Sequence, residues 1–251
     1  MTTTSRPAFS GIYPVSEAAL FIHATMGAIS PYRPPFKPIP KGAFKGVSTR
    51  HVHDWARDGL ASNYLAGVSA RDTTLNFLDL ISLRLIAAMR VHGVAPDDIQ
   101  EAHTLLQSKW GVTHPFAMKP LWVYGRPVFI RENLTFLSIN KGWQAAFDFI
   151  ENYLTRLHGI TFGHDQAATT WEPSRGVLLD PGIQFGEPCI SGTRVATEVL
   201  WSFHVAGDSE KELARMYGID ISRIEAALDW ERKLAAARNS GVSLILAPSL
   251  S

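Results

Sequence analysis

The chain has 251 residues, of which 46% are hydrophobic, with a formal net charge of +1 and one cysteine. This length and apolar content suit one large domain or two modest ones, and a single cysteine excludes an internal disulfide framework and favours a reducing compartment. The first residues contain no apolar signal-like stretch, and no run approaches the ~20 apolar residues that span a bilayer, so we expect a cytoplasmic protein without a membrane partner.

Basic and acidic residues are unevenly distributed along the chain. Residues 1–60 hold seven basic and three acidic side chains, whereas residues 176–251 hold seven basic and ten acidic ones. A basic surface attracts a polyanion and an acidic surface repels it. The sequence therefore indicates that a contact with nucleic acid lies in the N-terminal part.

Two helices are predicted near the N-terminus. The first covers 16–25 with Ser16 as its N-cap, and the second covers 49–59 and ends at Gly59. The start and the outer face of the second helix favour phosphate and base contacts, although an ordinary solvated face has the same composition. The predicted DNA contacts are Ser48, Thr49, Arg50, His53 and Arg57.

A proline-rich loop at 30–46 separates these two helices. Its basic residues alternate with aromatic ones, a pattern that can follow a phosphate backbone or enter a minor groove. The same pattern suits an ordered surface loop that packs its own aromatic side chains, and both interpretations stay open. The basic residues of the loop are Arg33, Lys37, Lys41 and Lys45.

Further helices and short strands are predicted in the middle of the chain. A helix at 75–91 is apolar on nearly all sides, which is typical of a buried helix, and a helix at 96–110 begins at Pro96. The other expected segments are a two-stranded wing at 64–75, a hairpin at 121–136, an amphipathic helix at 142–158 and a polar linker at 164–175.

The most informative stretch is 179–233. Two short amphipathic helices, broken at 217–220 by a Gly-containing turn, are typical of a helix-turn-helix. Three acids on the second helix, Glu225, Asp229 and Glu231, repel phosphate, so we expect this pair to contact a second copy or a partner rather than DNA. A turn-rich segment before the helices predicts a structural motif of Gly186, Pro188, Gly192, Thr193 and Arg194.

This stretch resembles a bacterial domain-of-unknown-function family that occurs in antitoxins of the VapB type. The family pattern is D-P-x-x-x-x-G-x-P-x-I-x-G-T-R, then a helix, G-x-S-x-x-E-[IL], a tyrosine and a second helix with A-L near its end. The resemblance implies a small helical, DNA-binding-like domain and a partner toxin, usually a PIN-like ribonuclease. The matching residues are Asp180, Pro181, Gly186, Pro188, Ile190, Gly192, Thr193, Arg194, Gly207, Ser209, Glu212, Leu213, Tyr217, Ala227 and Leu228.

The N-terminal half is similar to MerR-type winged helix-turn-helix regulators. Those proteins begin with a helix, a reading helix, a wing and a helix with an F-x-D-L-x-x-L stem. MerR-type proteins join the first two helices by a few residues, whereas here about twenty intervene. The matching residues are Tyr13, Ser16, Glu17, Ala18, Ala19, Trp55, Arg57, Gly59, Leu60, Phe77, Asp79, Leu80 and Leu83.

Residue patterns that carry chemistry are weak in this sequence. His51 and His53 do not face one direction on a helix, Cys189 has no neighbouring cysteine, and the acids occur without a metal-binding constellation. Glycine motifs that bind nucleotides are missing as well. We therefore expect no metal, no cofactor and no enzymatic activity.

These observations predict a mainly α protein with a small β hairpin or wing. The expected parts are a MerR-like winged helix-turn-helix at 1–115, a hairpin, helix and linker at 116–172, a homeodomain-like helix-turn-helix of the antitoxin family at 173–240 and a tail at 241–251. The uncharged, β-prone tail can add to a partner's sheet, and antitoxins of this sort cover the toxin with C-terminal segments. The predicted toxin contacts are Leu244, Ile245 and Leu246.

The predicted function is that of a type II antitoxin. It would bind and neutralise a PIN-like ribonuclease toxin and, as a homodimer, bind operator DNA and repress its own operon. The alternative is a stand-alone MerR-like regulator that senses a small molecule in a pocket lined by Trp122, Phe129, Phe136 and Trp143.

Overall fold

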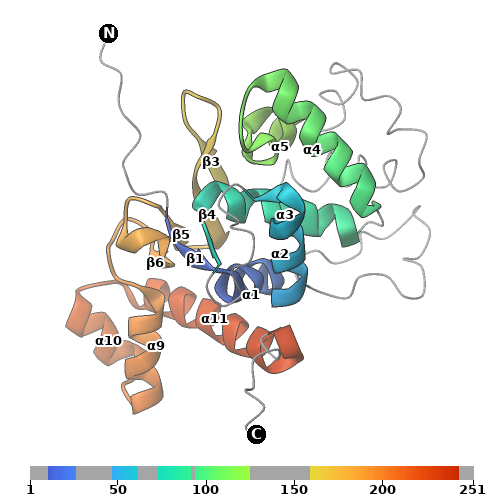
Figure 1. Cartoon of the computed structure of the whole chain (residues 1–251). Coiled ribbons are helices and arrows are strands. Elements are labelled where there is room, and N and C mark those ends of the chain that lie inside the picture. The colour runs from blue at the N-terminus through green and yellow to red at the C-terminus, as the bar shows by residue number, and fades with distance from the viewer. Residues whose placement is uncertain (1–10, 27–46, 62–72, 92–93, 125–158, 243–251) are drawn as a thin grey trace, which may run out of the picture.

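The computed structural model describes residues 11–26, 47–61, 73–91, 94–124 and 159–242 (Figure 1). Helices dominate these residues and two small antiparallel sheets accompany them, which confirms the expected mainly α class. No helix in the described ranges is both long and apolar enough to cross a membrane. The elements are β1 (Tyr13–Pro14), α1 (Val15–Met26), α2 (Thr49–Trp55), η1 (Ala56–Leu60), β2 (Thr74–Leu75), α3 (Phe77–Val91), α4 (Pro96–Trp110), η2 (Pro115–Ala117), α5 (Lys119–Tyr124), β3 (Ile160–Phe162), β4 (Ala168–Ser174), β5 (Val177–Leu179), η5 (Gln184–Gly186), β6 (Cys189–Ile190), α9 (Thr197–Ala206), α10 (Glu210–Tyr217), α11 (Ile221–Ala237) and η6 (Arg238–Val242).

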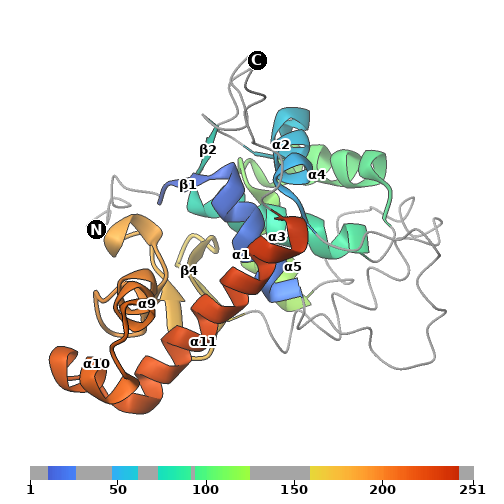
Figure 2. The ribbon, with the colours of Figure 1, turned by 90° about the horizontal axis from the view of Figure 1, so that it is seen from below.

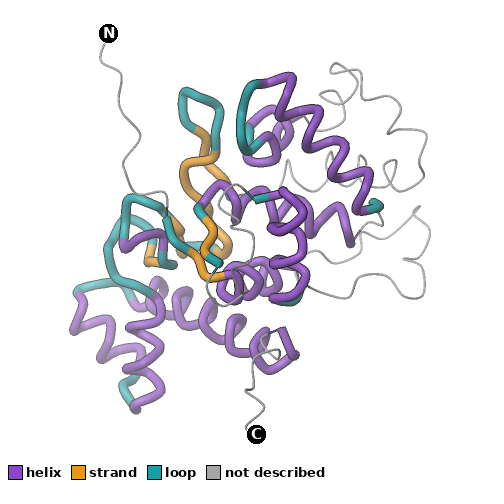
Figure 3. The backbone as a smooth tube through the Cα atoms, in the orientation of Figure 1, coloured by secondary structure: helices purple, strands orange, loops and turns teal. Residues whose placement is uncertain are grey.

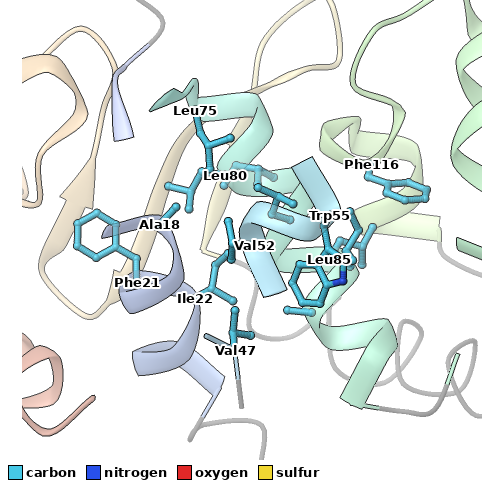
Figure 4. Packing of buried hydrophobic residues seen from close by; sticks show 14 of the residues in the cluster. Ala18, Phe21, Ile22, Val47, Val52, Trp55, Leu75, Leu80, Leu85 and Phe116 are labelled. Carbon is cyan, nitrogen blue, oxygen red and sulfur yellow. The ribbon is translucent and has the colours of Figure 1, made fainter. Parts of the chain in front are cut away.

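The two N-terminal helices form close to their predicted positions. The Ser48 side chain caps α2, because its Oγ accepts a hydrogen bond from the backbone N–H of His51 at 3.3 Å. After Trp55 the helix becomes irregular, and Gly59 reverses the backbone with a φ of +85°. α1 packs against α2, and Figure 4 shows Val52 of α2 next to Ile22 of α1.

α3 lies at the centre of the main core. Its side chains from Asp79 to Met89 are buried around the whole helix, as its all-round apolar pattern predicts. The helix begins with a reciprocal cap, in which the Asn76 backbone N–H donates to Asp79 Oδ2 and the Asp79 backbone N–H donates to Asn76 Oδ1, both at 2.9 Å. His114 Nε2 lies 2.9 Å from the other Asp79 oxygen and ties η2 to α3.

The linker predicted at 164–175 is wrong, because most of that segment is strand β4. Trp171 is fully buried and pairs with Ile160 of β3 on one side and Leu179 of β5 on the other. Burial of one large aromatic side chain therefore outweighs the polar composition of its neighbours. The four-stranded sheet has the order β3-β4-β5-β6, and Figure 3 shows its strands gathered between helices.

For the described residues of the segment, the hairpin predicted at 121–136 is also wrong. Residues Leu121 to Tyr124 belong to helix α5. Pro120 lies in the first turn of α5, where a helix tolerates proline. The other residues of that hairpin and the amphipathic helix predicted at 142–158 lie outside the described residues. Of the predicted wing, only the strand β2 is described, and it pairs with β1.

One hydrophobic core joins the N-terminal helices to the sheet and to the C-terminal half of α11. Phe21 of α1 meets Trp230 of α11 with 6.0 Å between ring centroids, and the Arg84 guanidinium of α3 lies 5.2 Å from the Trp171 ring centroid. In Figure 2, α11 runs from α10 to α1. A second, smaller core holds α9, α10 and the first half of α11 together through Ile190, Leu200, Leu213, Ile224, Ala227 and Leu228.

Candidate nucleic-acid and partner interface

The exposed face formed by α2 and the η1 turn that follows it carries two arginines and two acids. The side chains of Arg50 and Arg57 are 75% and 52% exposed. Both arginines pair with the same carboxylate, because Arg50 Nε lies 3.7 Å and Arg57 Nη1 lies 3.1 Å from the oxygens of Asp54. Arg57 Nε also lies 3.2 Å from Asp58 Oδ1. The two arginines are exposed as predicted, but the formal charge of this face is balanced by Asp54 and Asp58.

The other residues predicted on α2 are less accessible. Ser48 is occupied as the N-cap, and Thr49 is only 7% exposed because it lies on the inner face with Val52. His53 is half-buried, and its Nδ1 lies 3.8 Å from Asp54 Oδ1. Arg50 of α2 and Arg57 of η1 are thus the predicted side chains best placed to reach a phosphate or a base edge.

Several predicted site residues lie outside the described residues. Three of the four aromatic residues predicted to line the pocket of the alternative hypothesis are among them. The others are the basic residues of the proline-rich loop and the three apolar residues of the tail. The residues are Arg33, Lys37, Lys41, Lys45, Leu244, Ile245 and Leu246.

The glycine-rich motif of the C-terminal region packs directly on the N-terminal strand. The Tyr13 hydroxyl donates to the Gly186 carbonyl at 3.0 Å, and the Ile12 backbone N–H donates to the Phe185 carbonyl at 3.2 Å. Gly186 has a φ of +94°, and a Cβ there would lie 2.2 Å from the Tyr13 hydroxyl oxygen. Glycine is required at this position both for the backbone conformation and for the close approach of Tyr13.

The remaining motif residues form a tight turn that leads into α9. Thr193 Oγ1 donates to the Ile190 carbonyl at 2.8 Å and accepts from the Val195 backbone N–H at 3.1 Å. The Pro188 carbonyl accepts from the Thr197 backbone N–H at 2.9 Å. Arg194 is exposed, and its carbonyl accepts from the Gln184 side chain. These hydrogen bonds fix the backbone of the turn, so the motif has a structural role.

Replacing Gly186 with alanine is expected to destabilise the protein by roughly 2–4 kcal/mol, because the new Cβ collides with Tyr13 and the residue adopts an unfavourable positive φ. Gly192→Ala is the matched control. Gly192 also has a positive φ, +72°, but nothing lies within 4 Å of its Cβ position, so only about 1 kcal/mol is expected. Urea unfolding of the two variants measures the difference, and equal losses would mean that the contact with Tyr13 is unimportant.

Helices α9, α10 and α11 form a compact three-helix module. Ser209 and Glu212 make a capping box at the start of α10, and Gly218, with a φ of +64°, ends it. α10 and α11 are joined by three residues at the turn that the sequence predicts. Glu231 is buried, but Glu225 and Asp229 are exposed on α11, as an acidic, phosphate-repelling face requires.

Two arginines of the module, Arg232 and Arg223, are engaged by nearby groups. Arg232 Nη1 lies 2.6 Å from Asp229 Oδ1, and Arg232 Nη2 lies 3.5 Å from Glu210 Oε1. Arg223 donates to the carbonyl of Ser191. The electrostatics of this module therefore favour a protein partner over DNA.

Large apolar side chains are exposed on the same three helices. Phe203 of α9 is 39% exposed, although it belongs to a residue type that is usually buried. The module lies at the edge of the molecule away from α4 and α5 (Figures 1 and 2). Contiguous exposed apolar side chains mark contact surfaces, and Val199 and Phe203 share one face of α9 because they lie four residues apart. The residues concerned are Val199, Phe203, Val205, Met216 and Ile221.

The described residues offer little metal-binding or nucleophilic chemistry. No cluster of three or more histidine, cysteine or acidic ligands in these ranges has the geometry to hold a metal ion. Cys189 is buried, and burial together with Glu187 raises the pKa of its thiol to about 11. The thiol is therefore protonated near neutral pH and is a poor nucleophile.

Comparison with known proteins supports the motif and the fold. The family model described as a protein of unknown function, DUF433, matches residues 177–230, from β5 to Trp230. No curated protein matches the chain. A crystal structure of Rv2018 from Mycobacterium tuberculosis is similar, with 20% sequence identity and a TM-score of 0.63 over 86% of this chain and 96% of that chain. The likeness to Rv2018 shows a shared fold over most of both chains.

Proposed function

We propose that the protein is a type II antitoxin, which binds and neutralises a PIN-like ribonuclease and represses its own operon as a homodimer. The observation that carries the proposal is the set of exposed apolar side chains on a module in which Arg223 and Arg232 are engaged by nearby groups and Glu225 and Asp229 are exposed. The resemblance of the 180–228 pattern to VapB-type antitoxins supports this function, and the family model covers the same region.

The proposal assigns the two tasks to different parts of the molecule. α2 presents Arg50, and the adjoining η1 presents Arg57, for operator DNA. A two-fold dimer would place two copies of this segment on two half-sites. The three-helix module presents its apolar residues to the toxin. DNA and toxin can then be bound together, because α2 and α9 lie in separate parts of the molecule (Figure 1).

Placing a charge on the apolar surface tests the toxin assignment. We expect Phe203→Glu to weaken the complex with the protein encoded by the adjacent reading frame at least ten-fold, because a buried unpaired carboxylate costs several kcal/mol in an interface. Co-expression and co-purification measure the effect, followed by titration of the ribonuclease activity with each variant.

Ser108→Glu is the matched control, because Ser108 is exposed on α4 at the other side of the molecule. The control should retain the partner and the inhibition. If Phe203→Glu stays folded by circular dichroism and inhibits the toxin as well as the unmodified protein, the module does not contact the toxin.

A further inference from the structure

The seam between α1 and the C-terminal module contains acidic side chains from four different elements. Glu17 on α1, Glu187 before β6, Glu198 on α9 and Glu231 on α11 line one small cavity. The only basic side chain among the described residues that line it is that of Arg238. Four carboxyl groups facing one basic group repel one another when they are all ionised.

Glu231 is the most enclosed member of this carboxylate cluster. The residue is only 3% exposed, and Thr197 Oγ1 donates to its Oε1 at 2.5 Å. Directly beside it, Trp230 packs on Phe21 of α1 and closes the seam. The charge on the cluster therefore acts on the contact that joins the N-terminal helices to the three-helix module.

The protonation of the cluster is altered by its surroundings. Burial, together with the charges of Glu187, Glu198 and Glu231, raises the pKa of Glu17 to about 7, and Arg238 acts against this rise. Burial also raises the pKa of Glu231, against the hydrogen bond from Thr197 and the charge of Arg238. Tyr13 faces the same end of α1, and burial and Glu17 raise the pKa of its phenol.

We propose that this carboxylate cluster is a proton-operated latch, which holds α1 against α9 and α11 when it carries a proton and loosens the seam when it is fully ionised. The proposal does not depend on the antitoxin function. Its consequence is that the position of α1 and the α2 packed on it, relative to the three-helix module, responds to pH near neutrality.

The size of the cavity favours a proton over a larger ligand. Its volume is about 30 Å³, which is the space of one water molecule. A lysine or arginine of a partner does not fit into that volume. A small cation does fit, so the experiment has to separate it from the proton.

The direction of the pH dependence follows from the raised pKa. A carboxyl group with a higher pKa in the folded protein than in the unfolded chain stabilises the fold fully below its ordinary value of 4.5. That contribution is lost as the pH rises through about 7, the value for folded Glu17. The protein is therefore expected to be more stable at pH 5 than at pH 8.

The test is the midpoint of thermal unfolding, Tm, between pH 5 and pH 8, with hydrogen exchange of the α1 and α11 amides at both ends of the range. We expect Tm of the unmodified protein to fall by roughly 5–10 °C on going to pH 8, with faster exchange in both helices. Glu17→Gln, which imitates the protonated carboxyl, should remove at least half of this fall and slow the exchange at pH 8. Glu225→Gln, an exposed change on α11, should leave the fall unchanged.

Two results would overturn the latch. The first is a pH dependence of Glu17→Gln that equals that of the unmodified protein, with Glu231→Gln as a second variant should the first fail to fold. The second is a Tm that stays level or rises towards pH 8 and then falls when EDTA is added, because a metal ion and not a proton would then hold the cluster together.

Discussion

Replacing Arg50 and Arg57 together with alanine is expected to reduce affinity for the duplex upstream of the protein's own gene by on the order of 100-fold. Both side chains are exposed on one face of the segment formed by α2 and η1, and each can contribute one charge-assisted contact worth about 1–3 kcal/mol. Fluorescence anisotropy with a labelled duplex measures the loss. The slope of log affinity against log salt should become shallower by about one for each phosphate contact removed.

Asp54→Asn gives the opposite expectation and serves as the matched variant. This carboxylate pairs with both arginines, so its removal frees them for phosphate and removes one repulsive charge. We expect a three- to ten-fold gain in affinity, corresponding to about 1 kcal/mol. Unchanged binding of both the double-alanine and the Asp54→Asn proteins would exclude α2 as the DNA-contacting helix.

Trp230→Ala is expected to have the largest effect on stability, a loss of about 3–5 kcal/mol. The side chain is fully buried and packs against Phe21, so its removal leaves a cavity in the seam between α1 and α11. For a protein of this size, each kcal/mol lowers Tm by roughly 2–4 °C, and calorimetry should show a fall of about 10 °C or more.

Trp230→Phe separates the loss of aromatic packing from the loss of the indole. The Trp230 Nε1–H has no hydrogen-bond partner among the described residues, so replacing the indole with phenyl removes no such bond there. We expect this variant to lose about half as much stability as Trp230→Ala or less. Equal losses would show that contacts of the larger indole ring, rather than ring packing on Phe21, hold the seam.

The sequence predicts the helices well because their signals are local. α4 begins at Pro96 and ends before Gly111 as its stop signals indicate, and α1 and α3 follow their apolar periodicity. The misassigned segments depend on distant partners. β4 is a strand because Trp171 is buried under α3 and between two other strands, and no periodicity within 164–175 reveals that environment.

The candidate sites also depend on residues that are distant in the sequence. The motif around Gly186 is visible in the sequence, but its reason, Tyr13, lies 173 residues away. The carboxylate cluster is assembled from four separate elements, so no spacing in the sequence could indicate it. Asp54 was a missed signal, since its spacing of four from Arg50 and three from Arg57 on one helix already predicts the pairing.

The proposed function requires that the protein binds both DNA and a partner protein. The most direct measurement is size-exclusion chromatography of the full chain co-expressed with the adjacent reading frame, with and without the duplex from upstream of its gene. From the proposed function we expect the chain to co-elute with its partner and the duplex to shift this complex to a larger size. A chain that elutes alone from both mixtures at moderate salt would contradict it.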